Sequence, residues 1–408
     1  MFELVGSTSS HYSARLINIK ISLPAMAAMD KLLDISAEFP LLPDICYLNH
    51  AAVAPWPRRT SEAVKRFAEE NATMGAYRYP QWLRVETALR EQLRTLLNAP
   101  DTDDIALLKN TSEGLSVVAH GLEWQAGDNI IISNEEFPSN RIVWESLRDR
   151  GVVIREADLH ASGSPEDALI SLIDECTRLL AISSVQYASG IRLDLQRLGD
   201  VCREHGILYC IDAIQSLGAL PMDVQALHAD FVAADGHKWL LGPEGVAVFY
   251  CRADVREQLQ LHQYGWHMIE RAGDFDQREW QAASSARRFE CGSPNMLGIH
   301  ALHASLSLLL ELGMETVSRQ VLDNAAYLLE RLGNMEPIEL ITPVVADRHA
   351  GIVTFRHSDA DAQLLWQYLT EHGVVCAQRG GGVRLSPHFY TEINKLDDVI
   401  KLITDYSA

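Results

Sequence analysis

The sequence predicts an α/β protein with a mostly parallel, seven-stranded sheet flanked by helices, followed by a smaller C-terminal α/β domain. Two observations favour this class. Short apolar runs typical of buried strands alternate with segments whose apolar residues recur at helical spacing. The length of 408 residues also exceeds one typical domain and suffices for two sizeable cores. The expected strands are residues 105–108, 130–133, 152–154, 179–185, 207–212, 231–234 and 246–250.

Helices are expected between these strands, because residues 169–176 and 195–202 carry apolar side chains at helical spacing. A long apolar helix from about Asn295 through Leu309 should lead into the smaller domain. The expected organisation is an N-terminal extension and a segment packing on the small domain (1–58), a large domain (59–294) and a small C-terminal domain (295–408). We expect the first thirty or so residues to be an ordered or partly ordered extension, with Met26 or Met29 as an alternative biological start.

Composition narrows the possible partners. A formal net charge of -20 argues against nucleic acid and anionic membranes, which require clustered Lys and Arg. No apolar stretch approaches the roughly 20 residues that span a bilayer. The seven cysteines are scattered without paired spacing, which indicates reduced thiols in a cytoplasmic protein.

Lys238 is the first candidate for a reactive group. Strand 231–234 should end in a tight turn at Asp235 and Gly236, placing Lys238 at the carboxyl end of the strand, where ligands bind in open α/β sheets. The apolar run of residues 239–241 can desolvate its amine, lowering the pKa and favouring a Schiff base. A surface lysine at a loop edge is the alternative.

Asp212 and Gln215 suggest which carbonyl compound the lysine would bind. Strand 207–212 ends abruptly in this aspartate. Beside a lysine-bound pyridoxal phosphate, Asp212 would keep the pyridine nitrogen protonated, so that the cofactor acts as an electron sink. Gln215 could donate to the phenolic oxygen of the ring. A helix N-cap is the alternative for Asp212.

Five motifs occur together in order: Tyr47–Ala52, Asn110–Gly114, Asp212–Gln215, Gly236–Lys238 and Arg288–Asn295. With them the chain resembles the class V aminotransferase family, which includes cysteine desulfurases, isopenicillin N epimerase-like enzymes and kynureninase. The resemblance covers about Asp44 to Leu402. It implies a fold-type I enzyme with pyridoxal 5'-phosphate bound to Lys238, working as a homodimer with active sites shared between subunits.

Phosphate recognition is expected at Thr111 and Ser112, where backbone N–H groups and hydroxyls open a helix after strand 105–108. A simple Thr or Ser helix cap is the alternative. By family resemblance His237 adds a donor, and Ser293 reaches the phosphate of the neighbouring subunit.

Two further positions differ between this chain and its relatives. Phe137 matches the family's ring-stacking position, where desulfurases have a histidine that can also take part in proton transfer. A purely structural core phenylalanine is the alternative. Asp235 replaces a small residue near the phosphate and should point elsewhere, because it would repel a dianion.

The substrate carboxylate is assigned to Arg384, since a guanidinium binds carboxylates bidentately. The resemblance supports it, because the strand carrying Arg384 leads into a Ser-Pro-His segment and a final amphipathic helix. Arg379 is a second candidate, and a structural ion pair is the alternative for either. Gln186 or Tyr187, placed where desulfurases have an asparagine beside the substrate, would shape specificity.

Cys376 weighs against a desulfurase. Such an enzyme needs a thiolate on a mobile loop before the carboxylate-binding arginine. Residues 373–378 are instead predicted to form a strand that continues almost directly to Arg384, with Cys376 buried among apolar neighbours. No metal site is expected, because His300 and His303 lack a third ligand.

The expected function is a pyridoxal-phosphate enzyme acting at Cα of a small amino acid, as an aminotransferase or a C–S or C–C lyase. Lys238 would form the Schiff base and then move the Cα proton. An amino-acid epimerase of the same family is the first alternative, and a cysteine desulfurase is less favoured. A catalytically silent ligand-binding homologue is the non-enzyme alternative.

Overall fold

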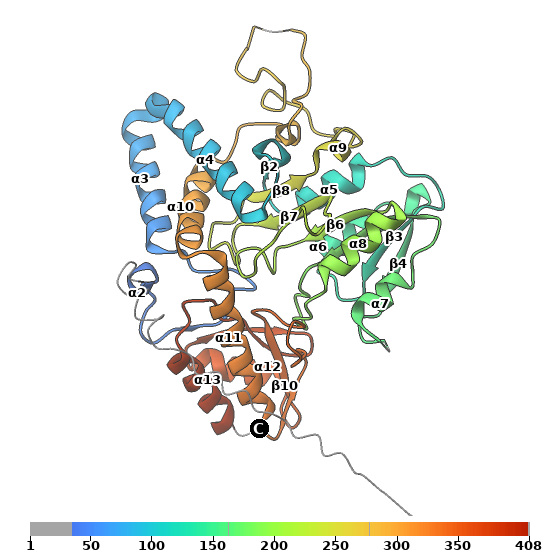
Figure 1. Ribbon diagram of the computed structural model, residues 1–408. Helices are drawn as coiled ribbons and strands as arrows, with labels where there is room; N and C mark the ends of the chain where they lie inside the picture. The colour runs from blue at the N-terminus through green and yellow to red at the C-terminus, as the bar shows by residue number, and fades with distance from the viewer. Residues whose placement is uncertain (1–34, 162, 277, 407–408) are drawn as a thin grey trace, which may run out of the picture.

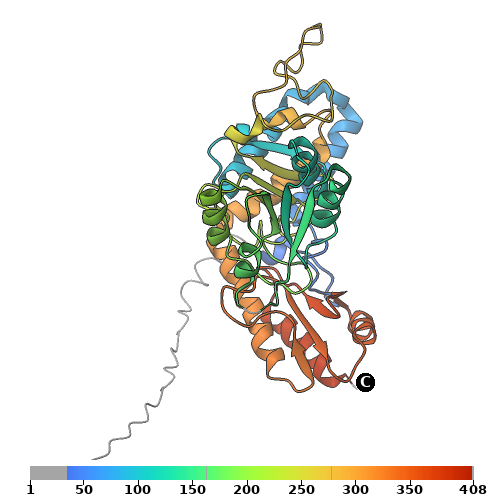
Figure 2. The same ribbon diagram turned by 90° about the vertical axis from the view of Figure 1, so that its right-hand side faces the viewer.

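The computed structural model describes residues 35–161, 163–276 and 278–406 of the chain (Figure 1). The first 34 residues of the expected N-terminal extension lie outside this part. Figure 2 shows a large α/β domain joined to a smaller one that ends at the C-terminus. The short elements of the described chain are α2 (Ile35–Glu38), η1 (Gly75–Arg78), η2 (Thr102–Asp104), η3 (Arg148–Arg150), α9 (Ala253–Arg256) and η4 (Ala286–Phe289).

The large domain contains the seven-stranded sheet, in the order β2-β8-β7-β6-β5-β3-β4. All strands run parallel except β8, which is antiparallel to both β2 and β7. Each strand overlaps one of the seven predicted runs, so this part of the fold prediction is confirmed. The strands are β2 (Ile105–Leu108), β3 (Asn129–Ser133), β4 (Val153–Ala157), β5 (Thr177–Ser183), β6 (Leu208–Asp212), β7 (Phe231–Asp235) and β8 (Ala247–Cys251).

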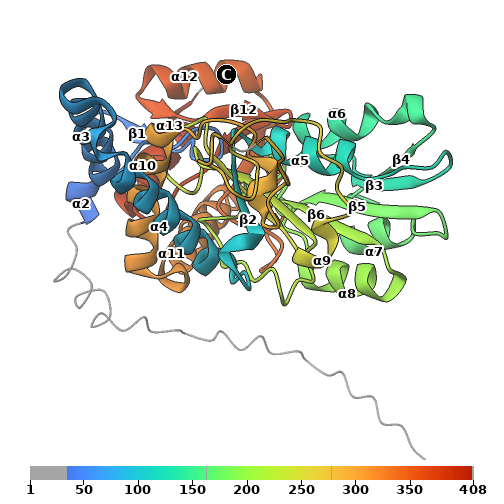
Figure 3. The same cartoon turned by 90° about the horizontal axis from the view of Figure 1, so that it is seen from above.

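Helices cover both faces of the sheet because its central strands are apolar on both sides. Figure 3 shows α5 (Thr111–Gly121) and α6 (Ser139–Glu145) over one face, with α7 (Pro165–Ile170) and α8 (Leu195–His205) over the other. The helix expected over residues 169–176 ends early. A turn replaces it, in which the Asp174 carboxylate accepts hydrogen bonds from the backbone of Cys176 and the side chain of Asn129.

A third helical group packs beside the sheet. The long helix α10 (Met296–Leu312) begins at the N-cap Asn295, as predicted, and packs along α3 (Arg58–Met74) and α4 (Tyr79–Leu97). After α10 the chain bends by 87° into α11 (Met314–Gly333). Within the described ranges no single helix is long and apolar enough to cross a membrane, although this bent pair reaches the required length and composition together.

The small domain has a four-stranded antiparallel sheet, in the order β12-β13-β10-β9, backed by helices. A separate parallel pair joins β1 (Cys46–Tyr47) to β11 (Val374–Val375), so the segment before α3 packs on the small domain. The remaining elements are β9 (Ile338–Leu340), β10 (Val353–His357), α12 (Ala362–Glu371), β12 (Ala377–Arg379), β13 (Gly382–Leu385) and α13 (Ile393–Asp405).

Candidate active site

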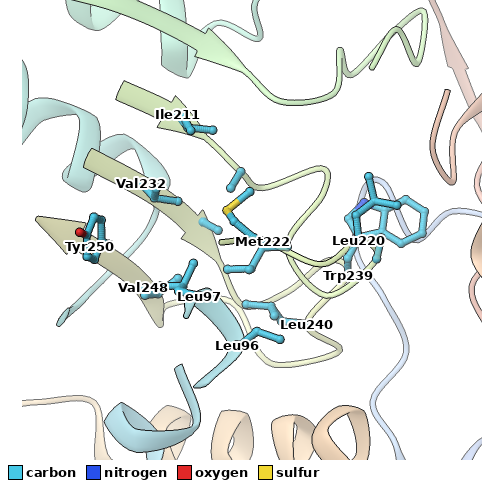
Figure 4. Close-up of a cluster of buried hydrophobic side chains, with 14 of the residues drawn as sticks. Leu96, Leu97, Ile211, Leu220, Met222, Val232, Trp239, Leu240, Val248 and Tyr250 are labelled. Carbon is cyan, nitrogen blue, oxygen red and sulfur yellow. The ribbon is translucent and has the colours of Figure 1, made fainter. Parts of the chain in front are cut away.

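Lys238 follows β7 and is held by the apolar residues after it. Trp239 and Leu240 belong to one buried apolar cluster, in which Trp239 lies beside Leu220 and Leu240 lies near Leu96 at the end of α4 (Figure 4). This anchoring leaves the Lys238 side chain only 8 % exposed, so the alternative of a surface lysine is wrong. Burial, together with the charges of Arg384 and Arg379, lowers the pKa of Lys238 to about 8, although Asp212 opposes the shift.

Asp212 ends β6, as predicted, and is 2 % exposed. Its Oδ1 accepts a hydrogen bond from the backbone of Ile214 at 3.0 Å. Turns rather than a helix follow it, so the N-cap alternative is wrong. Burial raises the pKa of this carboxyl to about 7, against the attraction of Lys238. The two groups therefore influence each other at the carboxyl edge of the sheet.

The Gln215 amide bridges two distant segments. Its Nε2 donates to the Ala51 carbonyl at 3.0 Å, and its Oε1 accepts from the Trp239 indole at 3.0 Å. Gln215 therefore connects the Tyr47–Ala52 motif to the residue after Lys238. Because Nε2 has a second N–H, donation to a cofactor oxygen stays a prediction.

The start of α5 presents one unsatisfied hydroxyl. Asn110 is the N-cap and accepts from the backbone of Glu113 at 2.9 Å, so the Thr or Ser cap alternative is wrong. Thr111 is buried, and its hydroxyl has no hydrogen-bond partner among the described residues. The exposed Ser112 hydroxyl donates to Ser139 at 2.8 Å. A free hydroxyl at a helix N-terminus suits an anionic ligand.

Asp235 extends β7 by one residue and contacts His237, whereas the sequence predicted a turn there. The Asp235 Oδ1 lies 3.1 Å from the His237 Nδ1, but the two atoms are not aligned for a hydrogen bond and have no other partner in the described chain. Ser293 is exposed beyond η4. The phosphate contacts expected of His237 and Ser293 stay predictions.

Phe137 lies beside the Lys238 amine. Its ring centroid is 5.6 Å from the Lys238 Nζ, and the Tyr187 ring packs edge-on against it at 5.1 Å. Because 40 % of Phe137 is exposed, the alternative of a core phenylalanine is wrong. The aromatic face is therefore available to a ligand held at Lys238.

Arg384 is buried on β13, with 2 % exposure, and has no ion-pair partner among the described residues. Its Nη1 donates to the Tyr187 carbonyl at 2.6 Å, while its Nε has no partner. Burial and the charge of Arg379 lower its pKa to about 10. Because no carboxylate of the described chain pairs with Arg384, the structural ion-pair alternative is wrong. A buried cation without a counterion is costly, so this position suits an anionic ligand.

Arg379 lies on β12 and is exposed. Its guanidinium donates to the carbonyl of Gln378, and no carboxylate of the described chain lies within ion-pair distance. The ion-pair alternative is therefore wrong here too. Both arginines remain available to anions.

Glu136 was missed by the sequence analysis. This buried carboxylate accepts hydrogen bonds from Ser133 at 2.8 Å, Asn140 at 2.8 Å and the Ser183 backbone at 2.9 Å. The candidate Gln186 also donates to it at 3.2 Å and is fully buried, so its side chain supports the site from within. The only local signal was an acid directly before Phe137.

Cys376 is 6 % exposed, as expected, and burial raises the pKa of its thiol to about 12. The strand predicted over residues 373–378 breaks at this cysteine, because β11 pairs with β1 whereas β12 pairs with β13. Gly380 and Gly381, both with positive φ, close the β12–β13 hairpin in two residues. No long loop separates Cys376 from Arg384.

Contacts and electrostatic interactions thus bring Lys238, Asp212, Phe137, Arg384 and Arg379 into one site. The residues fit pyridoxal phosphate. They offer a buried amine of lowered pKa, a carboxylate at a strand end, an exposed ring and an unsatisfied hydroxyl at a helix start.

A metal centre has one geometric candidate in the described ranges, away from the histidines considered above. Ligand atoms of Glu86, His267 and Glu290 lie within 4.8 Å of one another. Arg90 donates to both carboxylates at 2.7 Å, so a guanidinium already occupies the position between them. His300 instead has its Nδ1 2.8 Å from the Met296 carbonyl.

This chain is similar to known proteins of one described family. The family model described as Aminotransferase class-V matches residues 46–397. A protein of Methanothermobacter thermautotrophicus named probable cysteine desulfurase is 30% identical, covering 91% of this chain and 97% of the relative. A cysteine desulfurase of Salmonella dublin is 29% identical, over 83% and 86% of the two chains.

Solved structures show the same fold. The cysteine desulfurase CsdA from Escherichia coli superposes with a TM-score of 0.80 and 25% identity, covering 90% of this chain and 96% of that one. The cystine C-S lyase C-DES, in complex with cysteine persulfide, superposes with a TM-score of 0.84 and 24% identity, covering 91% and 100%.

Proposed function

The chain belongs to the class-V aminotransferase family of pyridoxal-phosphate enzymes, and from that membership we propose that it is a C–S lyase acting on a cysteine-type amino acid. Two of the relatives are named cysteine desulfurases, which supports a sulfur-bearing substrate. Cleavage of its C–S bond is therefore favoured over transamination or epimerisation. The observation that carries the proposal is a buried guanidinium without a counterion, Arg384, which shares a site with the buried amine of Lys238.

The cofactor would be held covalently by Lys238, with Asp212 at its ring nitrogen, Phe137 on its face, and Thr111 and Ser112 at its phosphate. When bound, pyridoxal phosphate supplies an electron sink for the bonds at Cα of an amino acid. The raised pKa of Asp212 reflects the cost of a buried carboxylate, and a ring N–H would supply the hydrogen bond that offsets it.

Arg384 would bind the substrate α-carboxylate and so fix the direction of the Cα–H bond. Lys238 Nζ would take the Cα proton. The C–S bond would then break, with its electron pair leaving on sulfur, which is released as a thiol. Addition of water to the remaining three-carbon fragment gives pyruvate and ammonia.

Cys376 distinguishes this reaction from that of a desulfurase. Transfer of sulfur to the enzyme requires a thiolate at the site, whereas Cys376 is buried and its thiol pKa is raised to about 12. We therefore propose that the sulfur leaves together with its substituent as a thiol, or as sulfide when the substrate is cysteine. No persulfide forms on Cys376.

The test is product analysis with purified holoenzyme and a panel of cysteine, S-substituted cysteines and alanine. A C–S lyase forms thiol or sulfide and pyruvate in equal amounts, and Lys238→Ala loses both this activity and the yellow absorbance band. Cys376→Ala should retain activity, like Cys202→Ala, which removes an equally buried thiol in α8.

Other products would overturn the proposal. Exchange of the amino group with a keto acid indicates transamination, and loss of optical activity without pyruvate indicates epimerisation. Loss of sulfide release in Cys376→Ala, with release retained in Cys202→Ala, indicates a desulfurase. Colourless protein after incubation with pyridoxal phosphate indicates a catalytically silent homologue.

We further infer a homodimer in a reducing, cytoplasmic setting. The seven cysteines are free, and Ser293 is exposed on a segment that in the family reaches the neighbouring subunit. Sedimentation at several concentrations tests the dimer. Mixing Ser293→Ala with Lys238→Ala subunits then tests sharing, because a shared site restores activity to only one of the two sites in a mixed dimer.

A further inference from the structure

The hairpin of β12 and β13 places two arginines on one face of the small-domain sheet. In its register Ala377 lies opposite Arg384, and Arg379 lies opposite Gly382. Paired residues share a face, and residues two apart on a strand share it as well. The side chains of Arg379 and Arg384 therefore leave the hairpin on the same side.

That side faces the large domain. Thr354 pairs with Arg384 on the neighbouring strand, and its hydroxyl donates to the Ala188 carbonyl at 2.6 Å. Arg384 itself donates to Tyr187, the preceding residue. The opposite face, which carries Val383 and Leu385, packs into the core of the small domain. Both arginines thus project toward the site containing Lys238.

The two arginines differ in burial but share a lack of partners. Arg384 is buried and Arg379 is exposed, and no carboxylate in the described ranges lies within ion-pair distance of either guanidinium. Arg379 lowers the pKa of both Arg384 and Lys238, so its charge acts within the site. In a chain of net charge -20, this cluster of cations forms a local positive potential that suits a ligand with more than one negative charge.

We propose that the substrate has a second anionic group at the end of its side chain, with its α-carboxylate at Arg384 and the distal anion at Arg379. The proposal rests on the C–S lyase function. It specifies the substrate as a cysteine derivative whose sulfur substituent ends in a carboxylate. Because Arg379 is exposed, the distal group stays near solvent, where a hydrogen-bonded ion pair gains specificity at low desolvation cost.

The test compares S-carboxymethyl-L-cysteine with S-carbamoylmethyl-L-cysteine, which match in size and differ in one charge. The holoenzyme should prefer the carboxylate by about fivefold in kcat/KM, mostly through KM. In Arg379→Gln the ratio of the two kcat/KM values should fall to about one. Gln378→Ala, an exposed change at the neighbouring position, should keep the wild-type preference. If the ratio of the two kcat/KM values is the same in Arg379→Gln as in the wild type, the proposal is wrong.

A binding experiment separates this proposal from the reaction type. Succinate and succinamate also match in size and differ in one charge, and their binding is followed by the shift in cofactor absorbance. If the holoenzyme binds succinate more tightly and Arg379→Gln does not, the second anion site stands even when no C–S cleavage occurs. If both compounds bind equally, the anion site is wrong even when the enzyme cleaves cysteine.

Discussion

The Nζ of Lys238 lies 5.6 Å from the ring centroid of Phe137. The ring contributes little to the core, since 40 % of it is exposed, yet it is held edge-on by Tyr187. An aromatic ring fixed beside a buried amine offers a stacking surface for a planar ligand bound to that amine. Because phenylalanine has no titratable group, Phe137 can position a ligand but cannot transfer a proton.

Phe137→Ala should weaken retention of pyridoxal phosphate. Loss of one stacking contact of about 0.5–1.5 kcal/mol corresponds to roughly 2- to 10-fold weaker binding of the cofactor. Absorbance titration of the apoprotein measures the dissociation constant. Phe275→Ala is the matched control, because Phe275 is 78 % exposed on the segment before η4. Unchanged affinity in Phe137→Ala would show that the ring does not stack.

Capture of the cofactor by the apoprotein should depend on the lowered pKa of Lys238. Only the neutral amine attacks the aldehyde, so the rate should rise as pH increases through about 8 and level off well below 10.5. Removing the nearby positive charge in Arg384→Ala should move this midpoint upward, since Arg384 lowers the pKa. Stopped-flow absorbance across pH 6–10 measures the rates. A midpoint near that of free lysine would contradict the buried amine.

The sequence predicted what depends on local pattern. Apolar runs located all seven strands of the large sheet, and an acid ending one run located Asp212 at its carboxyl edge. Helix ends were less predictable. The helix after Ser164 stops at Ile170 because the Asp174 carboxylate stabilises a turn, which apolar spacing does not report.

Contacts between distant residues lay beyond sequence reasoning. Gln215 bonds to Ala51, 164 residues away, and this contact does not follow from either local motif. Glu136 accepts from donors at the ends of β3 and β5 and from Gln186 just after β5, so its support of the site emerges only once the sheet is assembled. The lack of a counterion at Arg384 is likewise a property of the folded chain.

Cys376 should resist alkylation in the native protein. With its pKa raised to about 12, almost no thiolate exists at pH 8, and burial blocks access as well. The exposed Cys176 should react with iodoacetamide within minutes, which makes it the internal control. Peptide mass spectrometry after timed labelling measures each site. Rapid modification of Cys376 in the holoenzyme would indicate an accessible thiol and reopen the desulfurase reaction.

Arg90 should contribute strongly to stability. Its side chain on α4 is 12 % exposed and donates to Glu86 and to both oxygens of Glu290, which also accepts from the backbone of Leu107. Arg90→Met leaves two buried carboxylates unpaired, so the free energy of unfolding should fall by about 3–5 kcal/mol, as measured by urea denaturation.

Arg94→Met, one turn later, removes an exposed ion pair with Glu91 and should leave the transition unchanged. Adding Glu86→Gln to Arg90→Met should recover part of the lost stability, because it removes one of the two stranded charges. A loss that this second change does not reduce would mean that packing of the Arg90 side chain, rather than its charge, stabilises this junction between α4 and η4.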